Sequence, residues 1–297
     1  MDDYRRYLQP ENLAKIDSLE MKARLVVEGF ITGLHRSPYH GFSVEFAEHR
    51  QYRPGDEIRH LDWKVFARSE KYYIKQYEEE TNLRSMIIVD SSASMKYASQ
   101  GNISKFEYAS YLAASLSYLL ISQRDAAGLA LYDDGIRTFL PARSKQSYLS
   151  ELMRTLDSTE PSNTTGTAAA LDEIAERIRR RGLVVVISDF FDDTQSVLKA
   201  LSHFRHKNHD IIVFQLLDPK ELDFKFGPAA HFIDMETAEE MVTQPQQIQK
   251  SYAEAMHTFT QNLKKGCRNL NVDYNLIVTS DPFDKALREF VAKRSKM

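Results

Sequence analysis

Two aspartates and two serines lie where a parallel sheet would bring their oxygens together. Asp90 and Asp189 each end a short apolar run, and such runs are typical of strands buried on both faces of a sheet. Ser92 and Ser94 follow Asp90 at a spacing that lets both hydroxyls turn toward the point that its carboxylate faces. Two carboxylates placed together repel each other unless a cation lies between them or one takes up a proton. The pattern therefore predicts a metal site with these four residues.

A threonine is expected to complete this set of ligands. Thr165 stands just before a predicted helix at residues 167–181, and we choose it as the fifth ligand. Thr167 is expected to cap that helix through its hydroxyl, while Thr164 is an alternative ligand. All five ligands would be oxygens, which suit hard cations such as Mg²⁺, Mn²⁺ or Ca²⁺ rather than Zn²⁺. Of these cations we expect Mg²⁺.

The competing interpretation of Asp90, Ser92 and Ser94 is an ordinary polar turn after a strand, because Asp-Ser-Ser is common in turns. For Thr165 the competing interpretation is a capping hydroxyl. A second strand-end carboxylate, Asp189, with a threonine between the two strands, favours the metal site over both alternatives.

Alternating strands and helices are predicted from residue 85 onward. Short apolar runs predict strands, and apolar residues at three- and four-residue spacing predict helices. Strands are expected at residues 86–90, 127–132, 136–140, 183–189, 210–217 and 272–278, with a short extra one at 231–234. Helices are expected at residues 104–123, 145–156, 167–181, 196–207, 248–265 and 282–293.

This order of elements predicts an α/β fold with a doubly wound, mostly parallel sheet. Strands joined by helices pair in parallel through right-handed crossovers, and helices then cover both faces. Asp133-Asp134-Gly135 is a turn signal, so residues 136–140 are expected to form an antiparallel edge strand. Ligands of such sheets bind outside the carboxyl ends of the strands, which is where the predicted metal site lies.

The first 84 residues differ from the rest of the chain in composition and are expected to form an α+β extension. Pro10 suits a helix N-terminus, and apolar residues recur at helical spacing from there to Phe30. Charged and aromatic residues dominate from Phe42 to Tyr77, with alternating stretches that look like strands. Because this region has little aliphatic content, we expect residues 1–84 to pack on a main domain at residues 85–297.

Bulk composition excludes several classes of protein. The chain has 297 residues, 42% hydrophobic content and a net charge of −3, so it can bury a large core and has no overall bias toward nucleic acid or anionic membrane. No apolar run is long enough to span a bilayer. The N-terminus has no apolar stretch typical of a signal peptide, so we expect a cytoplasmic protein without direct membrane insertion. The single cysteine, Cys267, excludes an internal disulfide and a cysteine-based zinc cluster.

A nucleic-acid partner is also not expected. Basic residues interleave with aromatics between residues 50 and 75, which is a pattern found in nucleic-acid binding surfaces. Acidic residues interrupt that stretch, and Glu78-Glu79-Glu80 follows directly. The positive charge is therefore not concentrated as such a surface requires.

The spacing of the predicted ligands resembles a known metal site. Asp-Ser-Ser-Ala-Ser at residues 90–94, Thr165 before a helix and Ile-Ser-Asp at residues 187–189 resemble the metal-ion-dependent adhesion site of von Willebrand factor A domains. The resemblance implies that the two serine hydroxyls and the threonine contact the metal, and that the aspartates bind it directly or through water. It also implies that a partner carboxylate often completes the shell of ligands.

A second stretch resembles a bacterial family of unknown function. Residues 52–63 read YRPGDEIRHLDW, and this stretch looks like the hallmark of proteins that carry a von Willebrand factor A-like domain and are encoded beside MoxR-type AAA+ ATPases. The resemblance covers the chain from about Gly33 onward and implies an accessory factor to such an ATPase, acting in the maturation or remodelling of other proteins. Within it, the charged and aromatic residues from Arg53 to Arg68 form either an interaction surface or an internal network, and we favour the network.

These features predict a non-enzymatic, metal-dependent module that binds a MoxR-type AAA+ ATPase or its client protein. The alternative is a Mg²⁺-dependent phosphoryl hydrolase that uses Asp90, because hydrolases of the haloacid dehalogenase type also place a strand-end aspartate and Mg²⁺ at the end of a parallel sheet. Their second aspartate acts as a general acid/base, and Ser92 at that position cannot do so near neutral pH. No lysine motif of those enzymes is evident, and Ser92 lacks the Gly-x-Ser-x-Gly elbow of a serine hydrolase.

Overall fold

The computed structural model describes residues 9–35, 49–51, 66, 72–75, 83–226, 230–237 and 239–294. The chain forms two compact units, one of residues 1–33 and 83–297 and the other of residues 34–82. Residues 52–65 and 67–71, which include the YRPGDEIRHLDW segment, lie outside the described residues. Both interpretations of the residues from 53 to 68 therefore stay open.

A six-stranded sheet lies at the centre of the larger unit, in the order β10-β7-β6-β3-β4-β5. Its strands are β3 (Arg84–Asp90), β4 (Ala126–Tyr132), β5 (Ile136–Arg143), β6 (Leu183–Ser188), β7 (Asp210–Leu217) and β10 (Asp273–Val278). Neighbouring strands run parallel except β4 and β5, which run antiparallel. The predicted α/β sheet with an antiparallel edge strand is therefore confirmed.

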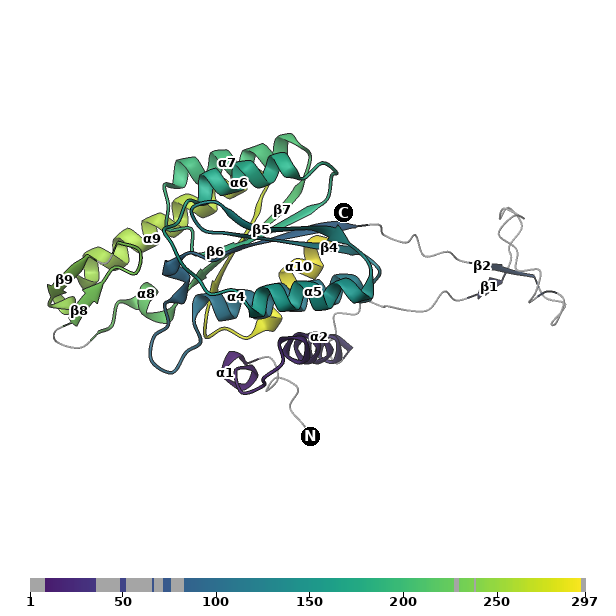
Figure 1. Ribbon diagram of the computed structural model, residues 1–297, viewed down its shortest axis with the longest axis horizontal. Helices are drawn as coiled ribbons and strands as arrows, with labels where there is room; N and C mark the ends of the chain where they lie inside the picture. Colours follow the sequence, from purple (N-terminus) through teal and green to yellow (C-terminus); the bar gives the residue numbers. More distant parts are fainter. Residues whose placement is uncertain are drawn as a thin grey trace. The chain divides into compact units, whose positions relative to one another are not determined.

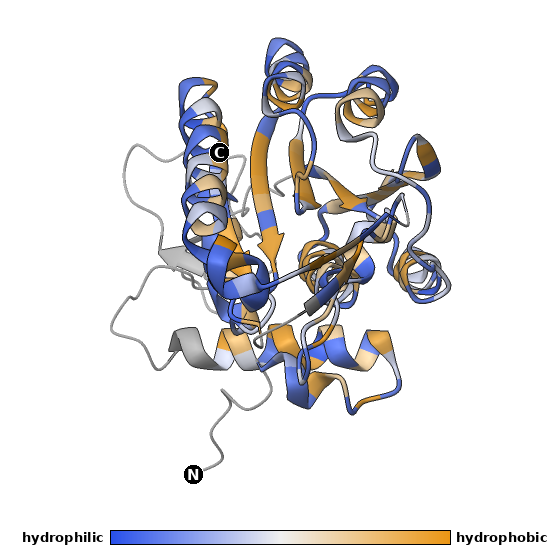
Figure 2. Ribbon diagram, turned by 90° about the vertical axis from the view of Figure 1, so that its left-hand side faces the viewer, coloured by the Kyte–Doolittle hydropathy of each residue, from blue (hydrophilic) through white to orange (hydrophobic). Residues whose placement is uncertain are grey.

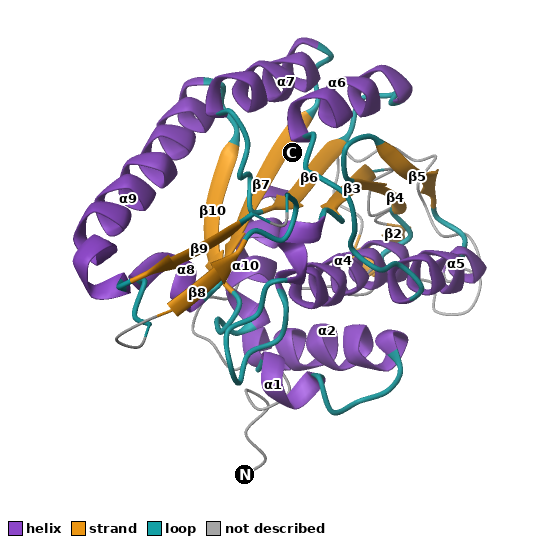
Figure 3. Ribbon diagram, turned by 60° about the vertical axis from the view of Figure 1, so that its left-hand side comes forward, coloured by secondary structure: helices purple, strands orange, loops and turns teal. Residues whose placement is uncertain are grey.

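Helices cover both faces of this sheet (Figure 1). They are α4 (Lys105–Ser122), α5 (Gln146–Asp157), α6 (Thr167–Arg177), α7 (Thr194–His206), α9 (Pro245–Asn269) and α10 (Phe283–Arg294). A short helix, α8 (Pro219–Asp223), follows β7, and a 3₁₀ turn, η3 (Ala93–Lys96), follows β3. Figure 2 shows that the strands are largely apolar along their length, as expected where both faces are covered. Helices α6, α7 and α9 lie on one face, and α4, α5 and α10 on the other (Figure 3).

Two helices precede the sheet and belong to the same unit. The helix predicted to start at Pro10 is two helices in the structure, α1 (Pro10–Leu13) and α2 (Leu19–His35), with a break at residues 14–18. Helix α2 buries its apolar side, and the Nζ of Lys22 donates to the Tyr111 hydroxyl of α4 (2.7 Å). The helical part of the predicted extension thus belongs with the main domain, and the separate unit is residues 34–82.

The smaller unit contains an antiparallel pair of short strands. β1 (His49–Gln51) pairs with β2 (Tyr73–Lys75), with Arg50 opposite Ile74. Within this unit Phe66 stacks on Tyr72 at a ring-centroid distance of 4.5 Å. Strand β2 falls within the alternating stretch that predicts a strand.

Several elements of the larger unit differ from the sequence-based expectation, and β5 is three residues longer than expected. Helix α6 ends at Arg177 rather than at residue 181, and α9 begins at Pro245 rather than at residue 248. The short strand expected at 231–234 is β8 (Ala230–Ile233), and it pairs antiparallel with an unpredicted strand, β9 (Glu240–Thr243). Because this hairpin stands apart from the central sheet, its strands lack the buried apolar run that reveals the others. None of the helices in the described ranges combines the length and the apolar content of a bilayer span.

The backbones of β6 and β3 lie close together where the two strands begin, and this can be tested at Gly182. A Cβ atom there would overlap the backbone oxygen of Arg84, whereas nothing lies within 4 Å of a Cβ placed at Gly135. We expect Gly182→Ala to lower the free energy of unfolding by about 1–3 kcal/mol, because the backbone has to shift. Gly135→Ala is the matched control and should stay within about 0.5 kcal/mol of the parent protein. Urea unfolding measures both, and equal stability of the two variants would contradict the close approach.

Candidate metal centre

Asp90 and Asp189 leave neighbouring strands at the same edge of the sheet. Strands β3 and β6 pair in parallel with Val89 opposite Ile187, so the aspartates follow that pair by one and two residues. The chain proceeds from β3 to β4 on one side, whereas β6, β7 and β10 lie on the other. The strand order therefore reverses between β3 and β6, and open α/β sheets bind ligands at such a switch point.

Asp90 is fully buried, and its carboxylate is held by three donors. The N–H of Ser92 donates to Oδ1 (2.9 Å). The hydroxyls of Ser188 (2.6 Å) and Tyr132 (3.3 Å) donate to Oδ2. Two of these donors come from the neighbouring strands β6 and β4, so the sheet itself fixes the orientation of the carboxylate.

The protonation of Asp90 is shifted by this environment. Burial, followed by the charge of Asp189, raises the pKa of Asp90 to about 7, although the hydrogen bonds from Ser188 and Ser92 act in the opposite direction. Near neutral pH the buried carboxyl group therefore gains or loses a proton readily. A cation would bind the deprotonated form, so its binding here would be linked to proton release.

Ser92, Ser94 and Asp189 continue the hydrogen-bonded cluster. Ser94 Oγ donates to Asp189 Oδ2 (3.0 Å), and Ser92 Oγ lies 3.1 Å from Ser94 Oγ. Ser92 and Asp189 are both fully buried, as is Asp90. The structure thus brings together four of the five residues that the sequence predicts for the site.

The turn after β6 directs the carboxylate of Asp189. Phe190 adopts a φ of 59°, a left-handed conformation that bulky residues seldom take. Its N–H donates to Ser188 Oγ (2.9 Å), and the N–H of Phe191 donates to Asp189 Oδ1 (3.0 Å). Gln215 Nε2 of β7 donates to the Asp189 backbone oxygen (3.0 Å). Strained backbone of this kind gathers at functional sites.

A buried lysine is an unpredicted member of the site. The ammonium of Lys105 lies 2.7 Å from Asp189 Oδ2 and 2.6 Å from Glu221 Oε1. Burial disfavours its charge, but the carboxylates of Asp189 and Glu221 outweigh burial and raise the pKa of Lys105. Lys105 is the first residue of α4, whose N-cap Ser104 accepts from the N–H of Glu107 (3.1 Å). This capping fixes where the helix begins and hence where the lysine lies.

Negative charge exceeds positive charge in this buried cluster. Three carboxylates, those of Asp90, Asp189 and Glu221, face one ammonium, which leaves an excess of two negative charges when all are ionised. Within the described ranges, no three His, Cys, Asp or Glu side chains converge in a way that could hold a metal ion. A cation here would therefore take serine hydroxyls together with the two aspartates. This all-oxygen donor set and its surplus charge fit a hard divalent cation.

Thr165 lies beside this cluster but pairs with another residue. Its hydroxyl donates to Glu236 Oε1 (2.5 Å), and its N–H donates to Glu236 Oε2 (3.0 Å). The loop that carries it lies against the loop after β3, because the N–H of Ala93 donates to the oxygen of Asn163 (2.9 Å). The predicted segment is thus at the site, and coordination by Thr165 itself stays a prediction.

The two threonines on either side of Thr165 and Gly166 occupy different environments. Thr164 is exposed, whereas Thr167 is fully buried and lies 3.4 Å from the Tyr132 hydroxyl that also reaches Asp90. The prediction that Thr167 caps α6 is wrong, because the N-cap is Gly166 and Thr167 is the first residue of the helix. A side chain at Gly166 would meet the backbone oxygen of Asp134, so the close packing of this loop requires glycine.

Several members of the site were missed by the sequence analysis. They are Tyr132, Ser188, Lys105, Glu221 and Glu236. Ser188 directly precedes Asp189, so adjacency to a predicted ligand was an available signal. The others come from separate strands, helices and turns that carry no motif, and the fold alone brings them to this edge.

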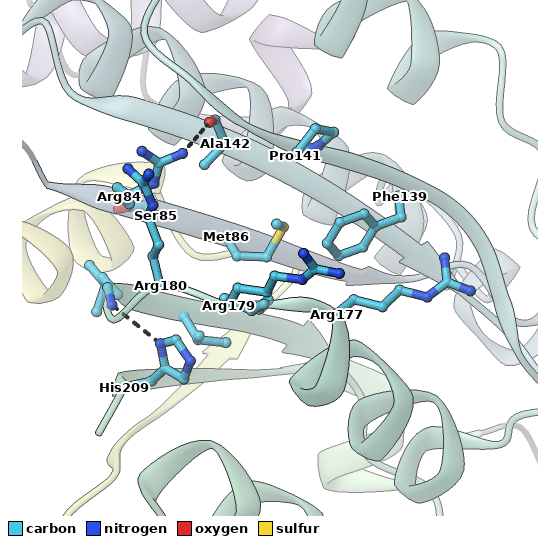
Figure 4. Close-up of a pocket in the computed structure, with 14 residues that line it drawn as sticks. Arg84, Ser85, Met86, Phe139, Pro141, Ala142, Arg177, Arg179, Arg180 and His209 are labelled. Atoms are coloured by element: carbon cyan, nitrogen blue, oxygen red, sulfur yellow. Dashed lines mark hydrogen bonds between the residues drawn. The ribbon is translucent and has the colours of Figure 1, made fainter. Parts of the chain in front are cut away.

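A cavity of about 220 Å³ lies at the opposite edge of the sheet, where β3 and β6 begin. Figure 4 shows Arg177, Arg179 and Arg180 beside Met86 and Phe139 in its lining. None of the predicted site residues lines this cavity. It is distinct from the strand ends that carry the aspartates.

The raised pKa of Asp90 predicts how stability depends on pH without divalent cation. The folded protein keeps the Asp90 proton between the ordinary value near 3.8 and about 7, while the unfolded chain releases it, so stability falls as pH rises through this window. Asp90→Asn should remove this dependence, which is on the order of a few kcal/mol. Asp157→Asn, at an exposed carboxylate, is the control. The free energy of unfolding is measured in a chelator from pH 4 to 8. If the parent and Asp90→Asn show the same dependence on pH, the pKa of Asp90 is not raised by burial.

Comparison with known proteins identifies the family of this chain. An uncharacterized protein of Mycobacterium bovis is 28% identical over 220 residues, covering 72% of this chain and 68% of that protein, and an uncharacterized protein of Mycobacterium tuberculosis gives the same values. A solved structure, an aerotolerance-related membrane protein from Bacteroides fragilis, shares the fold with 20% identity and a TM-score of 0.51, over 72% of this chain and 100% of that chain. The family described as "Protein of unknown function DUF58" matches residues 48–261, and the chain belongs to this family.

Proposed function

We propose that this protein is a metal-dependent protein-binding module of the von Willebrand factor A type and not an enzyme. The observation that carries the proposal is the buried cluster of Asp90, Asp189, Ser92 and Ser94 at the switch point of the sheet. The cluster holds more negative charge than Lys105 neutralises. A divalent cation would remove that surplus.

The arrangement of strands supports the proposed type of domain. The resemblance of residues 90–94 and 187–189 implies an aspartate-serine loop after a central strand of a mostly parallel sheet. Strand β3 has neighbours on both sides, and the sheet closes with one antiparallel edge strand, β5. These features agree with a von Willebrand factor A-like domain.

The proposed cation is Mg²⁺, held by Ser92, Ser94 and the two aspartates, with Thr165 as a further ligand. When bound, it would supply a positive centre that attracts a carboxylate from a partner. The residues of the chain fix the site around it, because Ser188 and Tyr132 orient Asp90. Such outer contacts are needed to keep metal ligands in place.

The second candidate, a Mg²⁺-dependent phosphoryl hydrolase, has one observation in its favour. Lys105 places a buried ammonium beside Asp189, although no lysine motif is evident in the sequence. Against it, Asp90 is fully buried and both of its oxygens accept hydrogen bonds, which impairs attack on a phosphorus atom. Ser92 also stands where those enzymes need an acid. We therefore favour binding over catalysis.

The proposed partner is a MoxR-type AAA+ ATPase or its client protein, met in the cytoplasm. This part rests on the resemblance of residues 52–63 to proteins encoded beside such ATPases. A partner that presents a carboxylate to a cation at the strand ends would use charge-assisted contacts, which are strong and directional. The activity to which this binding contributes would be the maturation or remodelling of other proteins.

The cation site is tested by thermal unfolding with Mg²⁺ and Mn²⁺. We expect either ion to stabilise the folded protein, by about 2.7 kcal/mol at one hundred times the dissociation constant, because it binds the folded state selectively. Asp90→Ala should abolish this shift and leave the protein folded. Ser94→Ala should weaken it.

Ser91→Ala is the matched control for Ser94→Ala, in the same loop. The Ser91 hydroxyl donates to the backbone oxygen of Tyr132 (2.8 Å) and so is turned away from the cluster. This variant should keep the full shift caused by the metal. If millimolar Mg²⁺ and Mn²⁺ give the parent protein neither a shift nor calorimetric heat, the metal site does not exist.

Partner binding is tested with a purified MoxR-type ATPase from the same organism. We expect the parent protein and Ser91→Ala to bind it in Mg²⁺, and Asp90→Ala to lose binding because the metal bridge is missing. Chelation should abolish binding by the parent protein. Surface plasmon resonance measures the affinity. Equal affinities for the parent and Asp90→Ala would contradict metal-dependent binding of the partner.

A further inference from the structure

The hairpin of β8 and β9 reaches the loop that carries Thr165. Its turn contains Glu236, and both carboxylate oxygens of this residue are used on Thr165, one by the hydroxyl and one by the N–H. The hairpin lies at the edge of the sheet where α8 and the start of α9 are found (Figure 1). A carboxylate from the chain itself is therefore placed beside the candidate metal centre.

Hydrogen bonds within the turn hold the backbone of Glu236 in place. Asp234 Oδ1 accepts from the N–H groups of Thr237 (2.7 Å) and Glu236 (2.8 Å), and these bonds lower the pKa of Asp234. Near the turn, Phe232 of β8 stacks on Phe224 at a ring-centroid distance of 5.4 Å. The turn is thus closed by Asp234 and anchored by an aromatic contact, which fixes the direction of Glu236.

Glu236 and one of the predicted ligands, Ser94, line the same cavity. A cavity of about 250 Å³ has Ser94 and Lys105 in one part of its lining and Asp234, Met235 and Glu236 of the hairpin in another. Tyr97 and Glu221 also line it, and Phe191 and Met235 add apolar surface. Carboxylate and hydroxyl oxygens therefore face the same small space.

The hairpin also carries apolar side chains that are exposed. They are Ile233 (55% exposed), Met235 (43%), Met241 (54%) and Val242 (77%), and they make up four of the seven large apolar residues exposed in the described part of the chain. A further one of the seven, Phe191, lies in the lining of the same cavity. Exposed apolar surface gathered on one element marks a site of protein contact.

We propose that Glu236 is a tethered occupant of the carboxylate position at this site, and that the partner is a protein segment with a glutamate beside apolar residues. This inference rests on the proposed function and names the chemistry of its partner. Residues 232–236 read Phe-Ile-Asp-Met-Glu, so the hairpin displays a glutamate next to methionine and isoleucine. The partner displaces this turn and then packs on the exposed apolar residues of β8 and β9.

Tethering makes Glu236 a strong competitor. A group held by a short connection acts at an effective concentration on the order of millimolar, so a free segment of equal intrinsic affinity binds poorly while the turn is in place. Removal of the Glu236 carboxylate opens the site. A partner must therefore bind tightly enough to displace Glu236 from the site.

The test uses the full chain and a labelled peptide with the sequence of residues 230–243, closed into a ring by a disulfide between cysteines added at its ends. In Mn²⁺, we expect Glu236→Gln to bind this peptide at least about tenfold more tightly than the parent protein. Glu239→Gln is the matched control, because it removes an exposed carboxylate of the same hairpin and should bind as the parent does. A peptide with glutamine at position 236 should bind none of the three proteins.

A second measurement follows the turn directly. Hydrogen exchange at the Thr165 amide should be slow in the parent protein and in Glu239→Gln, and faster in Glu236→Gln, because its acceptor is weakened. Equal peptide affinities for the parent and Glu236→Gln, or equal exchange at Thr165, would overturn the inference. Calorimetry with Mn²⁺ distinguishes failure of this inference from failure of the proposed function. If the parent binds Mn²⁺ and the peptide affinities are equal, the tethered-ligand inference fails and the metal site stands. If the parent binds no Mn²⁺, the proposed function fails as well.

Discussion

The burial of two like charges at adjoining strand ends is the constraint on which this edge of the molecule depends. Asp90 and Asp189 are both fully buried, and parallel pairing of β3 and β6 does not allow them to move apart. The surrounding groups offset part of this repulsion by donating hydrogen bonds to the two carboxylates. Ser188 and Tyr132 donate to Asp90, while Ser94 and Lys105 donate to Asp189. The pKa of Asp90 is still raised, so these contacts compensate the buried charge incompletely.

The compensation ties separate elements of the fold to one site. Lys105 joins α4 to Glu221 of α8, and Gln215 of β7 holds the backbone oxygen of Asp189. Asp218 at the end of β7 accepts from both the N–H and the hydroxyl of Ser99, which anchors the loop that leads into α4. Lys105, Gln215 and Asp218 are buried, so removal of a partner of one of them would leave a buried polar group unsatisfied, at a cost of about 1–3 kcal/mol. The site is therefore stiff where it would hold a cation.

The hairpin that carries Glu236 is a separate element beside this site. Glu236 touches the site through Thr165, while β8 and β9 pair with each other rather than with the central sheet. A two-stranded hairpin is only marginally stable by itself, and this one leaves apolar side chains of both strands exposed. The carboxylate that meets Thr165 is therefore carried by a separate two-stranded element and not by the central sheet.

The central sheet and its two aspartates could be predicted from the sequence, because a strand covered on both faces must be an apolar run and its end is marked by the first charged residue. Asp90 and Asp189 were expected to meet because parallel strands end at one edge, and Ser92 and Ser94 because they follow Asp90 at alternate positions. Residues that reach the site from other segments follow instead from the packing of the whole chain. Lys105 looks like any first residue of a helix, and Glu236 like any turn glutamate, because a charged side chain carries no periodic signal. Only the packing of α4 and the course of the β8–β9 turn place their charges beside Asp189 and Thr165.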